Sequence, residues 1–152
     1  SDMLHFLMTL GMAMLPVVEL RGAIPFGMAL GLPFWQVLLA ALIGNILPIP
    51  FIILFIRKVF QFLRKRFAFL EKLIDKIESK AMGKAEKVQK YELIGLCIFV
   101  AIPLPGTGAW TGALIAALLD IRMRRAVPSI FIGVLIAAVI VSITSYGIAS
   151  LF

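Results

Sequence analysis

The sequence predicts an all-α, polytopic membrane protein with two inverted repeats, each a re-entrant helical hairpin plus a transmembrane helix, joined by an amphipathic basic cytoplasmic helix. Hydrophobic residues make up 62% of the 152-residue chain, and the mean hydropathy is +1.07, whereas soluble domains are nearer half apolar. Two Pro/Gly motifs, at 18–25 and 102–111, interrupt apolar stretches near their middles, and a basic segment separates them. Together these observations indicate helices that enter the bilayer and turn back, beside helices that cross it.

The first apolar block, residues 3–32, is broken by the motif Val-Glu-Leu-Arg-Gly-Ala-Ile-Pro at 18–25. Backbone N–H and C=O groups must all be satisfied inside a bilayer, so irregular backbone survives there only buried in protein or lining a cavity. Residues 3–15 and 23–31 each form an arm of roughly 18 Å or less, which is too short to span a core of roughly 30 Å. We therefore expect a hairpin that enters from the outside.

The second block, residues 34–56, has the length of an ordinary spanning helix, about 34 Å at roughly 1.5 Å per residue. Asn45 lies at its centre, where its amide could face the site and bond the hairpin tip or could simply join two helices. Pro48 and Pro50 are expected to kink this helix near its cytoplasmic end.

The segment 57–90 carries eleven Lys or Arg and four Asp or Glu, which accounts for the whole net charge of +7. The positive-inside rule explains it as a cytoplasmic loop, so we expect no nucleic-acid partner. Apolar residues recur every three or four positions and predict an amphipathic helix that Gly83 weakens or ends. They are Leu63, Phe67, Leu70, Ile74, Ile77 and Ala81. The helix could be a dimerising seam, lie on an anionic leaflet, or pack on its own membrane domain.

The third block, residues 92–119, carries its break near its middle, and the fourth, 126–152, resembles an ordinary span. If all four blocks spanned, the cluster Arg122, Arg124 and Arg125 would lie outside, against the positive-inside rule. If instead 92–103 enters from the cytoplasm and 108–119 returns, that cluster is cytoplasmic. The charge pattern favours this second hairpin and places both termini outside.

An internal repeat supports the same topology. Arg21-Gly22-Ala23 aligns with Thr107-Gly108-Ala109 at an offset of 86, and Ala41–Gly44 aligns with Ile130–Gly133 at an offset of 89. We interpret the chain as one membrane domain, 1–152, with repeat 1 at 3–56, the linker at 57–90 and repeat 2 at 91–152. At 16.7 kDa the chain is small for a self-contained pathway, so we expect a homodimer surrounded by membrane lipids.

Glu19 and Arg21 are the only ionisable residues between His5 and Arg57. A charge inside a membrane is costly, roughly 3 kcal/mol or more, and indicates a functional site by default. Burial favours the protonated form of Glu19 and a nearby guanidinium favours the ionised form, so this carboxyl could load and release a proton. Arg21 suits phosphate or carboxylate. The alternative is an ion pair that closes the hairpin and binds nothing; Gly22 and Pro25 favour non-helical backbone here.

The second motif is uncharged. Thr107 is expected to cap a helix whose first N–H groups, at 108–111, lack helical partners. Two half-helix N-termini would then meet near the midplane and form an anion site. Alternatively, the glycines only let two hairpin tips pack closely. The predicted substrate- and ion-binding residues are Glu19, Arg21, Gly22, Pro25, Asn45, Pro103, Pro105, Gly106, Thr107, Gly108 and Trp110. Arg122, Arg124 and Arg125 are expected to anchor the chain at the interface or to gate anions.

We expect no metal, no cofactor and no enzymatic activity. His5 and Cys97 are each the only residue of their kind, the cysteine fits a packing role, and no nucleotide-binding or nucleophile motif is present.

Glu-Leu-Arg-Gly-Ala-Ile-Pro at 19–25 and Pro-Leu-Pro-Gly-Thr-Gly-Ala-Trp-Thr-Gly at 103–112 resemble the small multidrug export family over essentially the whole chain from Met3. That family in turn resembles the DedA (VTT, SNARE-associated) superfamily, which implies paired re-entrant hairpins and translocation of polyprenyl-phosphate or phospholipid coupled to ion gradients. The resemblance gives Glu19 the acidic role and Pro103, Pro105 and Gly106 the second-hairpin role. Arg122, Arg124 and Arg125 match the superfamily's arginine-rich motif only loosely, and the extra helices of larger DedA proteins are missing here.

The sequence thus predicts a transporter of the inner (cytoplasmic) membrane that moves an anionic substrate, such as a lipid phosphate, with Glu19 as proton carrier. Two alternatives stay open: proton-coupled export of cationic amphiphilic molecules, and a membrane scaffold that transports nothing.

Overall fold

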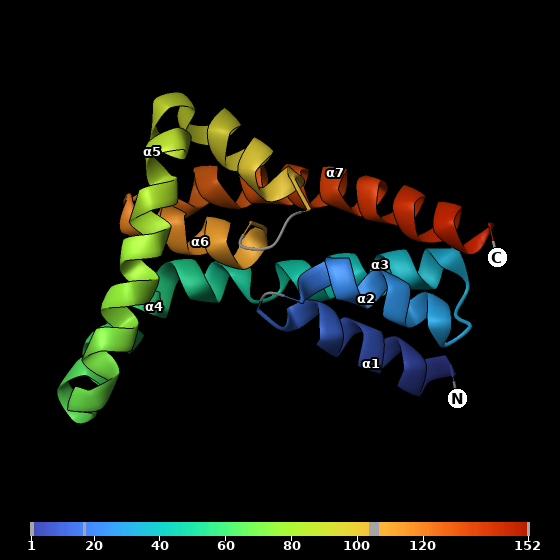
Figure 1. The fold of residues 1–152 in the computed structure, drawn as a ribbon, viewed down its shortest axis with the longest axis horizontal. Helices are drawn as coiled ribbons and strands as arrows, with labels where there is room; N and C mark the ends of the chain where they lie inside the picture. The colour runs from blue at the N-terminus through green and yellow to red at the C-terminus, as the bar shows by residue number, and fades with distance from the viewer. Residues whose placement is uncertain (1, 17, 104–106, 152) are drawn as a thin grey trace.

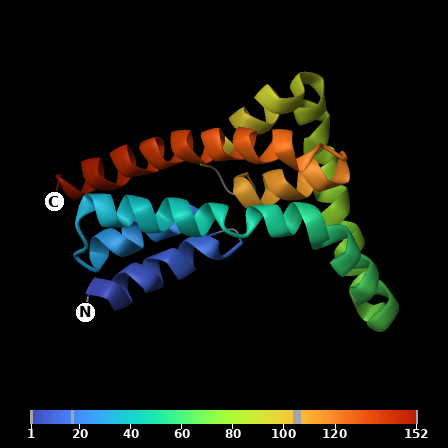
Figure 2. The ribbon, with the colours of Figure 1, turned by 180° about the vertical axis from the view of Figure 1, so that it is seen from behind.

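The computed structural model describes residues 2–16, 18–103 and 107–151, and over that part of the chain it contains helices and no strands, as predicted (Figure 1). The helices are α1 (Asp2–Met14), α2 (Glu19–Ala29), α3 (Phe34–Ile46), α4 (Ile49–Arg66), the 3-10 turn η1 (Ala68–Leu70), α5 (Glu71–Ala101), α6 (Ala109–Leu118) and α7 (Met123–Ala149). The start of α1 and the end of α7 lie at one end of the molecule, opposite the corner where α4 meets α5 (Figures 1 and 2).

The first three helices form a compact unit. α1 and α2 are short, with 13 and 11 residues, and run beside α3 (Figure 2). Gly44 of α3 lies directly against α1: a Cβ there would overlap the backbone oxygen of Leu10 and lie 2.9 Å from the Cβ of Ala13. A glycine is therefore needed for α1 to approach α3 this closely.

The last turns of α5, with α6 and α7, form a second unit of the same kind. A Cβ on Gly133 of α7 would lie 2.6 Å from the backbone oxygen of Cys97 and 2.8 Å from the Cβ of Val100. Gly133 is the residue that the sequence aligned with Gly44, and each of the two contacts the first helix of its own unit, α1 or α5.

Backbone hydrogen bonds repeat 89 residues apart where the short helices end. The N–H of Gly31 donates to the Met28 carbonyl at 3.0 Å, and the N–H of Asp120 donates to the Ala117 carbonyl at 3.3 Å. Both residues have positive φ, 82° and 56°. Pro33 and Arg122 then begin the next helices with similar extended backbone. This register aligns Arg21 with Trp110, so the offset of 86 predicted for 21–23 is wrong: these residues lie inside α2, whereas Thr107 and Gly108 precede α6.

Two helical stretches in the described part of the chain are long and apolar enough to cross a membrane: Phe34–Arg66 and Met123–Ala149. The first contains the predicted second block, 34–56, and the second covers residues 126–149 of the predicted fourth block, 126–152. The first stretch breaks between Ile46 and Ile49, beside Pro48 and Pro50, so the predicted kink is confirmed; Pro50 falls in the first turn of α4, where proline is tolerated.

The predicted linker helix is divided. α4 continues to Arg66, Phe67 is extended with φ −129°, and α5 then runs for 31 residues through Gly83 into the third apolar block. Of the two predicted effects of Gly83, the end of the helix is contradicted, because α5 is helical through it and one glycine costs only about 1 kcal/mol in a helix interior. Of the predicted apolar stripe, Ile74 and Ala81 are buried, whereas Phe67 and Ile77 are exposed. Part of the apolar stripe therefore packs on the protein itself.

Candidate functional site at the hairpin tips

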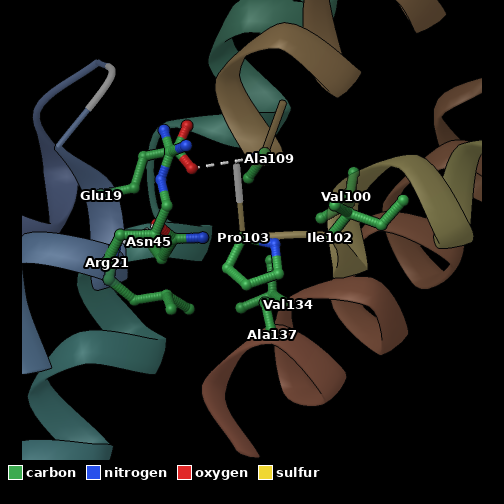
Figure 3. Close-up of a pocket in the computed structure, with 11 residues that line it drawn as sticks. Glu19, Arg21, Asn45, Val100, Ile102, Pro103, Ala109, Val134 and Ala137 are labelled. Atoms are coloured by element: carbon green, nitrogen blue, oxygen red, sulfur yellow. Dashed lines mark hydrogen bonds between the residues drawn. The ribbon is translucent and has the colours of Figure 1, made fainter. Parts of the chain in front are cut away.

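The carboxylate of Glu19 joins the two halves of the protein. It stands at the first residue of α2 and accepts the backbone N–H of Trp110 at 2.8 Å and that of Ala109 at 3.2 Å. Figure 3 shows the side chain reaching across to the start of α6. Glu19 is only 3% exposed. A residue of one hairpin therefore caps the return helix of the other.

This cap comes from another hairpin because the local sequence does not supply one. Gly108 precedes α6 and has no side chain, and the Oγ1 of Thr107 donates to the Ile102 carbonyl. The prediction of Thr107 as the cap is therefore wrong. The first N–H groups of any helix lack helical partners, and a carboxylate is favoured beside the positive end of the helix dipole. Both needs are met by Glu19.

Gly108 makes this approach possible. Its φ is +112°, and a Cβ there would overlap the Oε2 atom of Glu19. The sequence predicted that the glycines of this motif allow close approach, and at Gly108 the atom that approaches is the Glu19 carboxylate oxygen.

The start of α2 has a cap of its own. Its Leu20 N–H donates to the side-chain Oδ1 of Asn45 at 3.1 Å, and Asn45 is only 2% exposed. The expected contact between Asn45 and the hairpin tip is thus present. In the 89-residue register Leu20 corresponds to Ala109, and each donates its N–H to a side chain from outside its own helix. The two halves differ in which side chain accepts.

Arg21 lies beside this contact, half-buried, with its positive charge acting on Glu19. Both residues line a void of about 10 Å³ together with Asn45, Pro103 and Gly108, which is room for about one water molecule. Non-helical backbone was expected at Gly22 and Pro25, and this is wrong because α2 is helical through both. The void is too small for any organic substrate.

A larger cavity of about 370 Å³ adjoins the tips between α4 and α6. Arg21 lines both spaces. Trp110 lies in the wall of the larger one and donates its indole Nε1–H to the Met14 carbonyl at 2.9 Å. Sequence reasoning did not identify the apolar α4 side of this cavity, although its residues, Ile52, Ile56 and Phe60, recur every four positions.

The remaining predicted residues lie elsewhere. Pro105 and Gly106 fall outside the described residues. Arg122, Arg124 and Arg125 are exposed at the start of α7, so the structure does not bring them to the tips. Arg57, which was not predicted, binds both the Asp120 carboxylate at 3.0 Å and the Leu118 carbonyl at 2.9 Å. Among the described residues no three His, Cys, Asp or Glu are grouped as a metal site requires.

Searches of curated proteins and of solved structures found no match. A family model does match, and it covers the chain from the tip carboxylate through most of α7. Residues 19–140 fit the family described as "Putative small multi-drug export protein", and the chain, a membrane protein with two helical stretches long enough to span, belongs to that family.

Proposed function

We propose that this protein is a proton-coupled transporter of an anionic amphiphile, such as a lipid phosphate, and that Glu19 is its proton carrier. The observation that supports this most directly is the pair of hydrogen bonds from Ala109 and Trp110 to the Glu19 carboxylate. This carboxylate is the contact point of two hairpins that come from different halves of the chain.

Protonation would loosen that contact. Hydrogen bonds to an ionised acceptor are roughly twice as strong as those between neutral groups, so a neutral Glu19 holds α6 less firmly. The tips then separate more easily, and deprotonation draws them together again. A proton therefore acts on the relative position of the two hairpins.

The same geometry links proton uptake to anion binding. While Glu19 is ionised, it occupies the N–H groups that would otherwise attract an anion to the start of α6. Once it is protonated, a substrate phosphate near Arg21 can take its place. Arg21 adds a positive charge and a planar donor that suits phosphate.

We further propose that the two hairpins are re-entrant and that the halves form an inverted repeat in the inner membrane, with the α4–α5 corner cytoplasmic. An α6 of 10 residues is about 15 Å long, half of a bilayer core. The matching contacts of Gly44 and Gly133 support the repeat. The concentration of positive charge at 57–90 supports the orientation.

Export of a cationic amphiphile is the second candidate. It is favoured by the acidic Glu19 beside a mostly apolar cavity that Trp110 and Phe60 help to line, because aromatic faces attract cations. Arg21 in the same wall argues against it.

The test is transport by purified protein in proteoliposomes under an imposed pH gradient. The probes are a fluorescently labelled dodecyl phosphate and an equally labelled dodecyl quaternary amine. We expect gradient-driven movement of the phosphate and its loss in Glu19→Gln, in protein that helical circular dichroism shows to be folded. Movement of the amine alone would establish the export candidate. No gradient-dependent movement of either probe, or unchanged movement in Glu19→Gln, would contradict the proposal and favour a scaffold.

Topology is tested separately by labelling single cysteines in a Cys97→Ser background. Asp2→Cys should react with an impermeant reagent from outside and Lys76→Cys only from the cytoplasm. Labelling of both from one side would contradict the proposed orientation.

A further inference from the structure

We propose that the cavity between α4 and α6 is a binding site for one alkyl chain whose anionic headgroup lies against Arg21. This inference rests on the proposed function, because it locates the substrate that a proton at Glu19 would move. It adds the shape of that substrate: one tail, of limited length, with negative charge at the end nearest the hairpin tips.

The long walls of the cavity are apolar. α4 contributes Ile52, Ile56 and Phe60, four residues apart and so on one face of the helix. α6 contributes Leu114 from the opposite side, and Ile77 of α5 adds a residue from the α4–α5 corner. Such walls offer an alkyl chain dispersion contacts on several sides and no polar partner.

The polar lining is confined to one end. Arg21 of α2 lies there with Thr107 and Thr111 beside the start of α6. Arg21 also lines the small void that contains the Glu19 contact. A headgroup at Arg21 therefore lies next to the proton-carrying carboxyl, whereas the tail points along α4 toward Phe60.

The volume selects a single chain. Sites for small ligands occupy roughly 300–1,000 Å³, and a cavity of about 370 Å³ holds roughly a dozen groups of the size of a water molecule at about 30 Å³ each. One alkyl chain of about ten to twelve carbons fills that space, and a two-chain phospholipid would not fit inside it.

Trp110 connects this cavity to the tip contact. Its backbone N–H binds Glu19, its indole N–H binds the Met14 carbonyl of the first hairpin, and its side chain belongs to the cavity wall. An alkyl chain that moves the indole therefore acts on the two hydrogen bonds that Trp110 makes to the first hairpin. This gives substrate binding a physical route to Glu19.

The test uses the fluorescence of Trp110 in protein reconstituted into lipid nanodiscs. The chain has two tryptophans, and the other, Trp35, is 60% exposed on α3, so Trp35→Phe leaves Trp110 as the sole reporter. Dodecyl phosphate brominated near its headgroup is the probe, since bromine quenches indole emission on contact. The same brominated tail on a quaternary amine, and inorganic phosphate, are the comparison ligands.

We expect saturable quenching by the phosphate amphiphile, at least tenfold weaker in Arg21→Ala and partly restored in Arg21→Lys. Leu114→Phe and Ile56→Phe fill the cavity and should also weaken binding tenfold. Ile136→Phe is the matched control, because Ile136 is exposed on α7, and it should bind like the parent. Melting temperatures and helical circular dichroism establish that each variant is folded.

The proposal fails if quenching is the same in the parent, Arg21→Ala and Leu114→Phe, or if the amine binds as tightly as the phosphate. It also fails if inorganic phosphate binds at this site as tightly as the phosphate amphiphile does, since the tail would then contribute nothing to binding. Glu19→Gln separates this inference from the proposed function: it should abolish transport and still bind the probe. Transport that depends on Glu19 without quenching at Trp110 would refute this site alone.

Discussion

Glu19 and Gly108 occupy corresponding positions at the starts of α2 and α6, and the carboxylate of the first fills the space that a side chain on the second would need. Both have positive φ, 49° and 112°, and they are 89 residues apart in the sequence. The second half of the chain thus lacks a side chain at the place where the first half supplies the acid.

Replacement of Gly108 by alanine should therefore disrupt the tip contact. The backbone region that Gly108 occupies is nearly restricted to glycine and costs roughly 1–3 kcal/mol for other residues, and the new Cβ would also overlap Glu19. We expect a lower free energy of unfolding in mixed micelles and loss of transport. Gly147→Ala is the control, because nothing lies within 4 Å of its Cβ; equal stability of the two variants would contradict the close approach.

Asn45→Ala should destabilise the protein through α2. It leaves the buried Leu20 N–H without its acceptor, which costs about 1–3 kcal/mol. Gln36→Ala on the same helix makes no such change and should remain within about 0.5 kcal/mol of the parent. Denaturant titration of both variants measures the difference in the free energy of unfolding. An Asn45→Ala variant as stable as the parent would show that water replaces the amide.

Gly44→Ala and Gly133→Ala should be destabilising to a similar extent. Each new methyl group meets a backbone oxygen of the first helix in its unit, that of Leu10 in α1 or of Cys97 in α5, and overpacking costs typically 1–3 kcal/mol. Gly11→Ala on α1 has open space and should be neutral or slightly stabilising. If only one of the two contact glycines proved sensitive, the structural equivalence of the halves would be wrong.

Replacement of Asp120 by glycine should lower the stability of the protein less than its replacement by alanine. Its φ of 56° costs an ordinary residue about 1–2 kcal/mol, and its partner in the other half is Gly31. The ion pair that Asp120→Gly loses, to Arg57, is exposed on both sides and is worth up to about 1 kcal/mol. Asp120→Gly should thus stay near the parent in thermal unfolding, with Asp120→Ala below both; the reverse order would refute the strain at this position.

Most of the helix arrangement could be predicted from the lengths of the apolar stretches and from the proline and glycine residues that interrupt them. The break at Pro48 and the short helices around both motifs follow from local rules about proline, glycine and apolar length. The location of the cap on α6 could not be predicted in this way. Thr107 satisfied the local rule for a cap, and the acceptor instead comes from Glu19, about 90 positions earlier, through packing that no local pattern records.

Several residues of the site could be predicted from the sequence, but the contacts between them could not. Glu19, Arg21 and Asn45 were recognised because polar groups in an apolar chain are costly, and the structure brings all three to one void. From the sequence, the N–H groups at 108–111 were expected to bind a substrate. In the structure, two of them already bind Glu19. The cavity wall on α4 was missed since apolar residues every four positions also describe any helix packed in a membrane.

The glycine at position 108 has a consequence for the stoichiometry of the proposed cycle. Two hairpins meet, but only one of them contributes a titratable group, so each separation of the tips takes up a single proton. Movement of one proton together with a singly charged anion transfers no net charge across the bilayer. In the proposed cycle, transport of such an anion would therefore respond to the pH gradient and be insensitive to the membrane potential, whereas a doubly charged phosphate would carry current.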